Sequence, residues 1–133
     1  MRIVLDTNVL VSGLLSPHDP PGDMVRLVAM GDLSLCYDAR ILSEYREVLR
    51  RPAFQFGPDQ VKTLLDRIES NGELTGARPL PVNLPDPDDD AFLAVAIAGR
   101  AAYLVTGNIR HYPTRSRQGI EAVVPAKFLE IYR

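Results

Sequence analysis

The sequence predicts a three-layer α/β/α fold with a central, mostly parallel sheet. Short runs of aliphatic and β-branched residues alternate with helical patterns, and these runs lack the apolar–polar alternation of strands that face water. Strands separated by helices pair in parallel through right-handed crossovers. The chain has 133 residues, which is enough for one domain with a real core, so we expect a single domain over residues 1–133.

Composition and charge narrow the class of protein. The net charge is −2 and 46% of the residues are hydrophobic, so no basic field covers the whole surface and nucleic-acid binding would need a local basic patch. The single cysteine, Cys36, cannot form an internal disulfide, and no apolar run is long enough to span a membrane. We therefore expect a cytoplasmic protein without a membrane partner, in which Cys36 packs inside a strand.

The first predicted element is a buried strand at residues 2–5, which ends at Asp6. Thr7 and Asn8 follow, and an apolar helix continues over residues 9–15 until a proline-rich segment breaks it. Open α/β sheets place their ligand crevice at the carboxyl ends of the strands. Asp6 is therefore either a functional acid or the cap of the following helix, and this stretch favours neither.

A second helix is predicted at residues 22–30 and a second strand at residues 33–37. The third helix follows over residues 38–51, with Asp38 as its cap and apolar residues spaced three and four apart. Glu44 lies at the edge of this apolar stripe. It is either the partner of a surface salt bridge or an acid that leans over the core towards a neighbouring strand end.

A fourth helix is predicted over residues 58–71, because it carries a further apolar stripe and ends at an Asn-Gly pair. The prolines of residues 80–85 then require an extended chain. This extended segment leads directly to an acidic turn, which precedes the most apolar helix of the chain.

The acidic turn has four carboxylates, at Asp86, Asp88, Asp89 and Asp90. An acidic side chain at a helix N-terminus stabilises the helix by about 0.3–1 kcal/mol, but a cap requires only one or two of them. The surplus carboxylates repel one another. The turn is therefore either a solvated loop with one capping aspartate or part of a cation site.

The last third of the chain predicts two more strands, at residues 101–106 and 121–124, and a final helix at residues 125–132. Between the two strands lies the most basic loop of the chain. Its arginines are suited to contact phosphates, whereas we interpret His111 as a surface residue. These arginines are Arg110, Arg115 and Arg117.

The candidate acids converge in a parallel sheet. Asp6, Glu44 and Asp90 all fall on the side of the strand carboxyl ends. Oxygen ligands without cysteine or histidine partners select Mg²⁺ or Mn²⁺, and such ions support hydrolysis of phosphate esters by activating water and offsetting charge. No glycine-rich phosphate loop, paired nucleophile or zinc spacing competes with this interpretation.

Four motifs carry a resemblance to a known family. They are Asp6-Thr7-Asn8-Val9 after the first strand, Ser43-Glu44 in the third helix, Asp88-Asp89-Asp90-Ala91-Phe92-Leu93-Ala94-Val95-Ala96, and Tyr103-Leu104-Val105-Thr106-Gly107-Asn108. Together they resemble the successive motifs of the PIN-domain ribonucleases, and more narrowly the VapC-like toxins of bacterial toxin–antitoxin systems. The resemblance covers nearly the whole chain.

The resemblance implies a Mg²⁺- or Mn²⁺-dependent endoribonuclease in which Asp6, Glu44 and Asp90 bind the metal, while Thr7 or Asn8 hydrogen-bonds within the site. It also implies an RNA substrate, a small antitoxin partner and a homodimer. The arginines of the basic loop would then place the RNA.

Two positions depart from a simple alignment with the family. The run of three aspartates leaves the third acid ambiguous. We choose Asp90 because it directly precedes the helix, then Asp88, and Asp89 last. Many members of the family carry a fourth acid after Thr-Gly, but this chain has Asn108. An amide brings no charge, so a second metal should bind weakly in the absence of a substrate phosphate.

Two other functions share these features. Asn108 and the acidic pI of about 5.6 favour an RNA-binding or regulatory module that has the PIN fold but little or no catalytic activity. A DNA-directed nuclease of the flap-endonuclease type shares the acidic pocket, but the chain has no long basic insertion to form a helical arch.

Overall fold

The computed structural model describes residues 1–133 and contains a five-stranded sheet in which every pair is parallel. The strands are β1 (Arg2–Leu5), β2 (Ser34–Tyr37), β3 (Glu73–Leu74), β4 (Tyr103–Val105) and β5 (Ala122–Val123). The helices are α1 (Thr7–Leu15), α2 (Pro20–Ala29), α3 (Ala39–Leu49), α4 (Pro58–Asn71), α5 (Asp90–Ala98) and α6 (Pro125–Tyr132).

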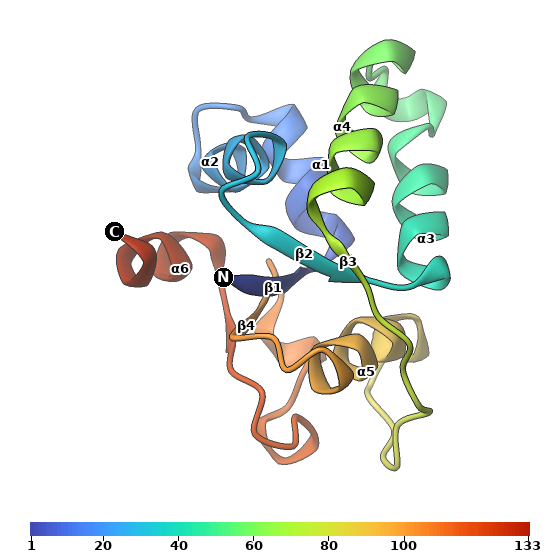
Figure 1. The fold of residues 1–133 in the computed structure, drawn as a ribbon, viewed down its shortest axis with the longest axis vertical. Coiled ribbons are helices and arrows are strands. Elements are labelled where there is room, and N and C mark those ends of the chain that lie inside the picture. The colour runs from blue at the N-terminus through green and yellow to red at the C-terminus, as the bar shows by residue number, and fades with distance from the viewer.

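The strand order is β3-β2-β1-β4-β5, so β1 lies at the centre. The chain builds the sheet outwards from β1 to β3 and then crosses to β4 on the other side of β1. Figure 1 shows α1 to α4 on one side of the sheet and α5 on the other, which confirms the three-layer α/β/α prediction. The change of direction between β1 and β4 is the point at which open α/β sheets bind ligands.

The core surrounds β1, whose residues Ile3, Val4 and Leu5 are fully buried. Helix α5 packs against β1, β2 and β4 and buries residues 92–96. A helix that is apolar on nearly every side must be surrounded by protein, so the start of α5 is fixed in place. This packing brings the acidic turn to the carboxyl end of β1.

Three elements differ from the sequence-based predictions. Helix α2 begins at Pro20. Proline is tolerated at the first positions of a helix, because the backbone N–H that it lacks would have no hydrogen-bond partner there. Helix α1 begins at Thr7. Strand β3 was not predicted, since it has only two residues and both are exposed. Gly72 permits β3 to pair with β2, because a Cβ there would lie 2.5 Å from the carbonyl oxygen of Leu35.

Cys36 lies buried in β2 without a disulfide partner, as predicted. None of the helices is both long and apolar enough to cross a membrane.

Candidate functional site

Asp6 lies where β1 and β4 end, and its backbone N–H donates to the carbonyl of Val105 at 2.9 Å. Its side chain is 5% exposed, and Oδ2 accepts hydrogen bonds from the hydroxyls of Thr106 at 2.9 Å and Tyr112 at 3.0 Å. Burial raises the pKa of Asp6, and the two hydroxyl donors lower it in part. Although Asp6 directly precedes α1, the hydroxyls that hold it come from the far side of the site.

Glu44 reaches the same end of the sheet from α3. The hydroxyl of Thr7 donates to its carboxylate, and the adjacent Tyr45, fully buried, donates its hydroxyl to the carbonyl of Leu5. Burial raises the pKa of Glu44, and the negative charge of Asp6 raises it further. The salt-bridge alternative is wrong, because Glu44 forms no ion pair.

Glu44, Asp88 and Asp90 line one cavity of about 300 Å³ between α3 and α5. Arg40 also lines this cavity, but its guanidinium pairs with Asp38 at 2.7 Å. None of these three acids forms an ion pair with a protein cation. The buried Oδ1 of Asp90 has no hydrogen-bond partner, and a buried polar atom in that state costs about 1–3 kcal/mol unless a ligand satisfies it.

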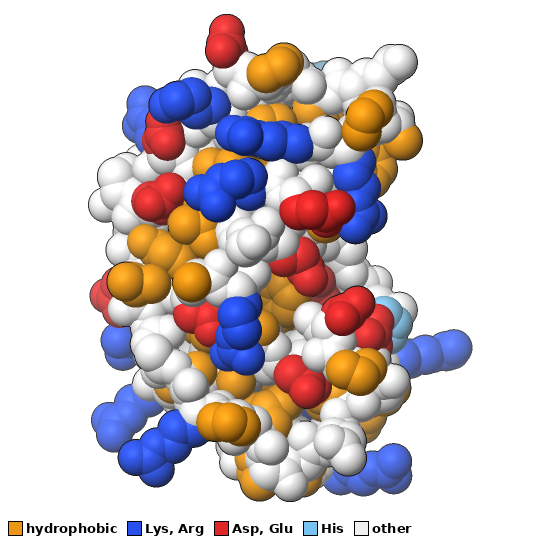
Figure 2. All heavy atoms as spheres, turned by 90° about the vertical axis from the view of Figure 1, so that its right-hand side faces the viewer, with side chains coloured by type: hydrophobic (Ala, Val, Ile, Leu, Met, Phe, Trp, Pro, Cys, Tyr) orange, Lys and Arg blue, Asp and Glu red, His pale blue; other side chains and the backbone are white.

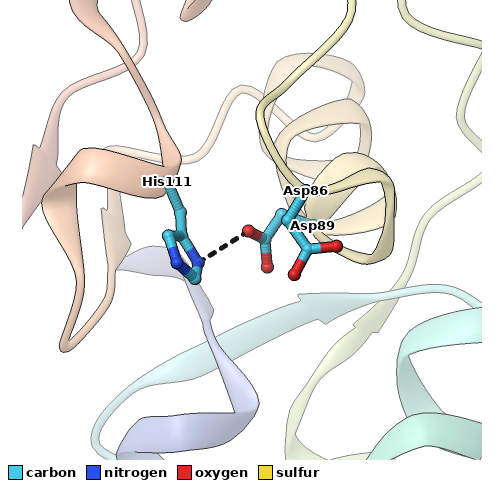
Figure 3. A group of neighbouring side chains, drawn as sticks. All are labelled: Asp86, Asp89 and His111. Carbon is cyan, nitrogen blue, oxygen red and sulfur yellow. Dashed lines mark ion pairs between the residues drawn. The ribbon is translucent and has the colours of Figure 1, made fainter.

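The acidic turn is a short 3-10 helix over Pro87–Asp89 that leads into α5. Asp86 caps it, since its Oδ1 accepts from the N–H of Asp88 at 2.9 Å. Asp89, the last choice among the three aspartates, is the most buried, at 7% exposure, and its Oδ2 lies 2.9 Å from Nδ1 of His111 (Figure 3). Burial and the negative charge of Asp6 raise the pKa of Asp89 to about 6. Asp89 is therefore close enough to Asp6 for their charges to interact, whereas Asp88 and Asp90 line the cavity of Glu44.

The two polar residues after Asp6 have separate contacts. Thr7 bonds to Glu44, whereas Oδ1 of Asn8 accepts from the N–H of Gly107 at 3.0 Å. Both contacts join α1 to another element, Thr7 to α3 and Asn8 to the segment after β4. The backbone N–H of Asn108 donates to Thr106 at 3.1 Å, which places the residue beside Asp6 and its partners.

The three arginines of the basic loop have different environments. Arg110 and Arg115 are exposed, whereas Nε of Arg117 donates to the carbonyl of Tyr112 at 2.6 Å. Arg117 thus fixes the loop that carries Tyr112. Figure 2 shows acidic side chains gathered on the lower half of one face, next to a histidine, with basic side chains around them.

Sequence reasoning missed Thr106, His111 and Tyr112. Thr106 follows β4 as Asp6 follows β1, so the position of strand ends was a signal for it. Tyr112 had no local signal, since it meets Asp6 across 106 positions. Burial and the charge of Asp6 raise the pKa of Tyr112 far above its usual range, so it remains a hydroxyl donor.

Carboxylate oxygens dominate this site, and four of the acids, Asp6, Glu44, Asp88 and Asp90, form no ion pair with a protein cation. Asp6 is buried and Glu44 and Asp90 are partly buried, and a desolvated carboxylate without a counter-charge is costly. A hard divalent cation would satisfy both their charge and the free oxygen of Asp90. The residues present therefore fit such an ion.

Comparisons with known proteins agree with this geometry. A family model described as a PIN domain matches residues 2–110. A solved structure with a similar fold is the crystal structure of VapBC2 from Rickettsia felis bound to a DNA fragment from their promoter. The TM-score is 0.59 at 18% identity, and the match covers 93% of this chain and 98% of that chain. A search of curated proteins found no match.

Proposed function

Because the chain belongs to the PIN domain family, we propose that it is a Mg²⁺- or Mn²⁺-dependent endoribonuclease that hydrolyses RNA phosphodiester bonds, with residues 1–133 as a single nuclease domain. The observation that carries this proposal is the meeting of Asp6, Glu44 and the acidic turn at the carboxyl end of β1. Three segments separated in sequence bring acids to one place, and Asp6 and Glu44 have no protein cation to offset their charge there.

The proposed cation ligands are Asp6, Glu44 and Asp90, with Asp88 lining the same cavity as Glu44. Asp90 contributes the buried oxygen that lacks a partner. A divalent cation held there would supply a Lewis acid that activates water and offsets the charge of the scissile phosphate. Neighbouring hydroxyl groups would orient the carboxylate ligands. Thr106 and Tyr112 donate to Asp6, and Thr7 donates to Glu44.

The RNA would approach across the basic loop. Arg110 and Arg115 are exposed and free to contact phosphates, whereas Arg117 positions the loop itself. Asn108 lies beside this path and offers a neutral amide that can hydrogen-bond to the substrate or to water. An acidic protein with a net charge of −2 needs such a local cationic patch to hold RNA.

The structural similarity to VapBC2 supports a role as the toxin of a toxin–antitoxin pair. In that role the partner would be a small antitoxin protein, and the nuclease would act as a homodimer in the cytoplasm. A short neighbouring reading frame that encodes a DNA-binding fold with a disordered tail would support this pairing.

The Asp6→Asn variant tests the function. The substitution keeps the size of the side chain and removes its charge, so metal-dependent cleavage of single-stranded RNA should fall by more than about 100-fold, with an unchanged circular dichroism spectrum. Asp32→Asn is the matched control, because Asp32 is exposed and distant from the acids in the fold. Undiminished cleavage by Asp6→Asn would contradict the assignment, and a parallel assay with DNA decides between RNA and DNA as substrate.

A second candidate, an RNA-binding or regulatory module with weak or no catalysis, is favoured by Asn108. Calorimetry with Mn²⁺ separates the two functions. The nuclease should bind Mn²⁺ with a dependence on Asp90, whereas the regulatory module should bind RNA without such metal binding.

A further inference from the structure

The turn between α3 and α4 carries two aromatic rings next to two arginines. Its sequence is Arg50-Arg51-Pro52-Ala53-Phe54-Gln55-Phe56. The rings of Phe54 and Phe56 stack, with their centroids 5.4 Å apart and their planes inclined by 15°. Phe56 packs against the hydrophobic core, whereas Phe54 does not, so Phe54 is the outer ring of the stack. An aromatic ring in this position offers a face on which another flat ring can stack.

The backbone of the turn holds the outer ring in a fixed place. Pro52 opens a short 3-10 helix over Pro52–Phe54, and a proline at this position has a fixed φ. The N–H of Phe54 donates to the carbonyl of Arg51 at 3.1 Å, and the N–H of Gln55 donates to the carbonyl of Pro52 at 3.2 Å. A ring that is already held in position loses little conformational freedom when a ligand binds to it.

Arginines lie on α3 and at its end, next to this ring. Arg46 and Arg50 are one helical turn apart on the exposed side of α3, and neither forms an ion pair. Arg51 pairs with Glu47 at 2.9 Å, but an exposed pair of this kind is weak, so a phosphate can compete for the guanidinium. Figure 2 shows basic side chains over the upper part of the face, above the acidic ones. The surroundings of Phe54 therefore complement the charge of a phosphate backbone.

The turn adjoins the acidic site through the face of α3 that carries Glu44. Arg51 follows Glu44 by seven residues, which is two helical turns, or about 10 Å along the helix axis. The hydrogen bond to Glu47 and the charge of Glu47 raise the pKa of Arg51, and the charge of Glu44 raises it further. Arg51 and Glu44 are therefore close enough to interact, and a single strand that crosses the acids reaches Phe54 within a few nucleotides.

We propose that Phe54 and the neighbouring arginines form a second contact site for single-stranded RNA, in which an unpaired base stacks on Phe54 and Arg50 contacts a phosphate. Every base has a flat face, so stacking on an aromatic ring tolerates any sequence but requires bases that are free of a duplex. Figure 1 shows the turn above the sheet and the segment between β4 and β5, which contains the basic loop, below it. The role of this site in cleavage rests on the proposed nuclease function, but its RNA binding does not.

A second stacked pair in the chain lacks these features. Tyr132 is exposed and stacks on Phe128 at 5.7 Å, but the neighbouring cations Lys127 and Arg133 are both paired with acids. Figure 1 shows α6, which carries this pair, on the side away from the carboxyl ends of the strands. Tyr132 is therefore a matched control for Phe54.

The test measures binding of a fluorescently labelled single-stranded RNA to the full chain in EDTA, where no metal-dependent cleavage occurs. Phe54→Leu should weaken binding by about 10-fold, whereas Tyr132→Leu should bind like the wild type. Arg50→Gln should reduce the slope of log affinity against log salt by about 0.7, as expected for one lost phosphate contact on a single strand. An RNA duplex of the same sequence should bind equally to Phe54→Leu and to the wild type, because its bases are already stacked on one another.

Phe54→Trp gives an independent readout of the same contact. The chain contains no tryptophan, so the new indole would be its only one, and a base stacked on it should quench its fluorescence. If Phe54→Leu does not fold, this quenching still decides the matter. Unquenched fluorescence at saturating RNA, wild-type binding by Phe54→Leu, or equal losses in Phe54→Leu and Tyr132→Leu would overturn the proposal. Failure of the nuclease proposal looks different, because Phe54-dependent RNA binding would remain while no RNA is cleaved in Mg²⁺ or Mn²⁺.

Discussion

The acidic site has a sheet half, Asp6 at the end of β1, and a turn half, the aspartates at the start of α5. The two halves differ in how many of their carboxylate oxygens accept hydrogen bonds from the protein. On the sheet side, Asp6 receives hydroxyl hydrogen bonds from Thr106 and Tyr112. On the helix side, the buried Oδ1 of Asp90 accepts no hydrogen bond, and Oδ2 of Asp89 has His111 as its one ion-pair partner. Under the proposed function, Thr106 and Tyr112 would fix the geometry of Asp6, and the turn would keep a carboxylate oxygen free to bind a cation.

Glu44 lies between the two halves, so removal of its charge should have the largest effect on RNA cleavage. Glu44→Gln keeps the hydrogen bond from Thr7 but removes the charge that faces the turn, and RNA cleavage should fall by more than about 100-fold. Cleavage rates at saturating Mg²⁺ measure this. Glu47→Gln on the exposed face of α3 is the control, and equal losses in both variants would remove Glu44 from the site.

Tyr112→Phe loosens the sheet half alone. The ring stays packed while Asp6 loses one donor, so we expect about a 10- to 100-fold loss of cleavage and a loss of about 1–3 kcal/mol in the free energy of unfolding. Single-turnover kinetics and urea unfolding measure the two effects. If stability falls but the rate does not, then Tyr112 only supports the fold and the comparison between the halves is wrong.

Asp89→Asn tests the charge held in the turn half, and its effect should be the smallest of the three. Because the pKa of Asp89 is raised to about 6 in the folded state, its protonated form stabilises the metal-free protein at about pH 4, and this contribution is lost as the pH rises through about 6. The wild type should therefore lose stability relative to Asp89→Asn over that interval. Thermal melts from pH 4 to pH 7 measure it, and parallel curves would contradict the pKa direction.

The sequence predicted four of the five strands, all six helices to within about two residues, and the segments that supply the acids. Buried runs and strand ends are local patterns, so Asp6 and Glu44 could be chosen from them. The choice among the aspartates could not be made in this way. The run passes from a 3-10 turn into α5, so its members do not share one helical spacing: Asp89 is buried beside His111, whereas Asp88 and Asp90 line the cavity with Glu44.

The contacts of Tyr112 and His111 lay beyond prediction for a different reason. Both residues follow β4 in an irregular loop, whose path depends on two short 3-10 turns and on the bond from Arg117 to the carbonyl of Tyr112. No periodic pattern encodes such a path. The missed residues are therefore those whose position depends on long-range packing.

The most direct test of the account is the position of a cation in a crystal of the wild-type protein grown with Mn²⁺ and measured at the manganese absorption edge. We predict an anomalous peak bounded by the carboxylates of Asp6 and Glu44 and by the acidic turn, with oxygen ligands at about 2.0–2.3 Å. The absence of a peak within bonding distance of Asp6 and Glu44 would contradict the central claim that these acids converge to hold a metal ion.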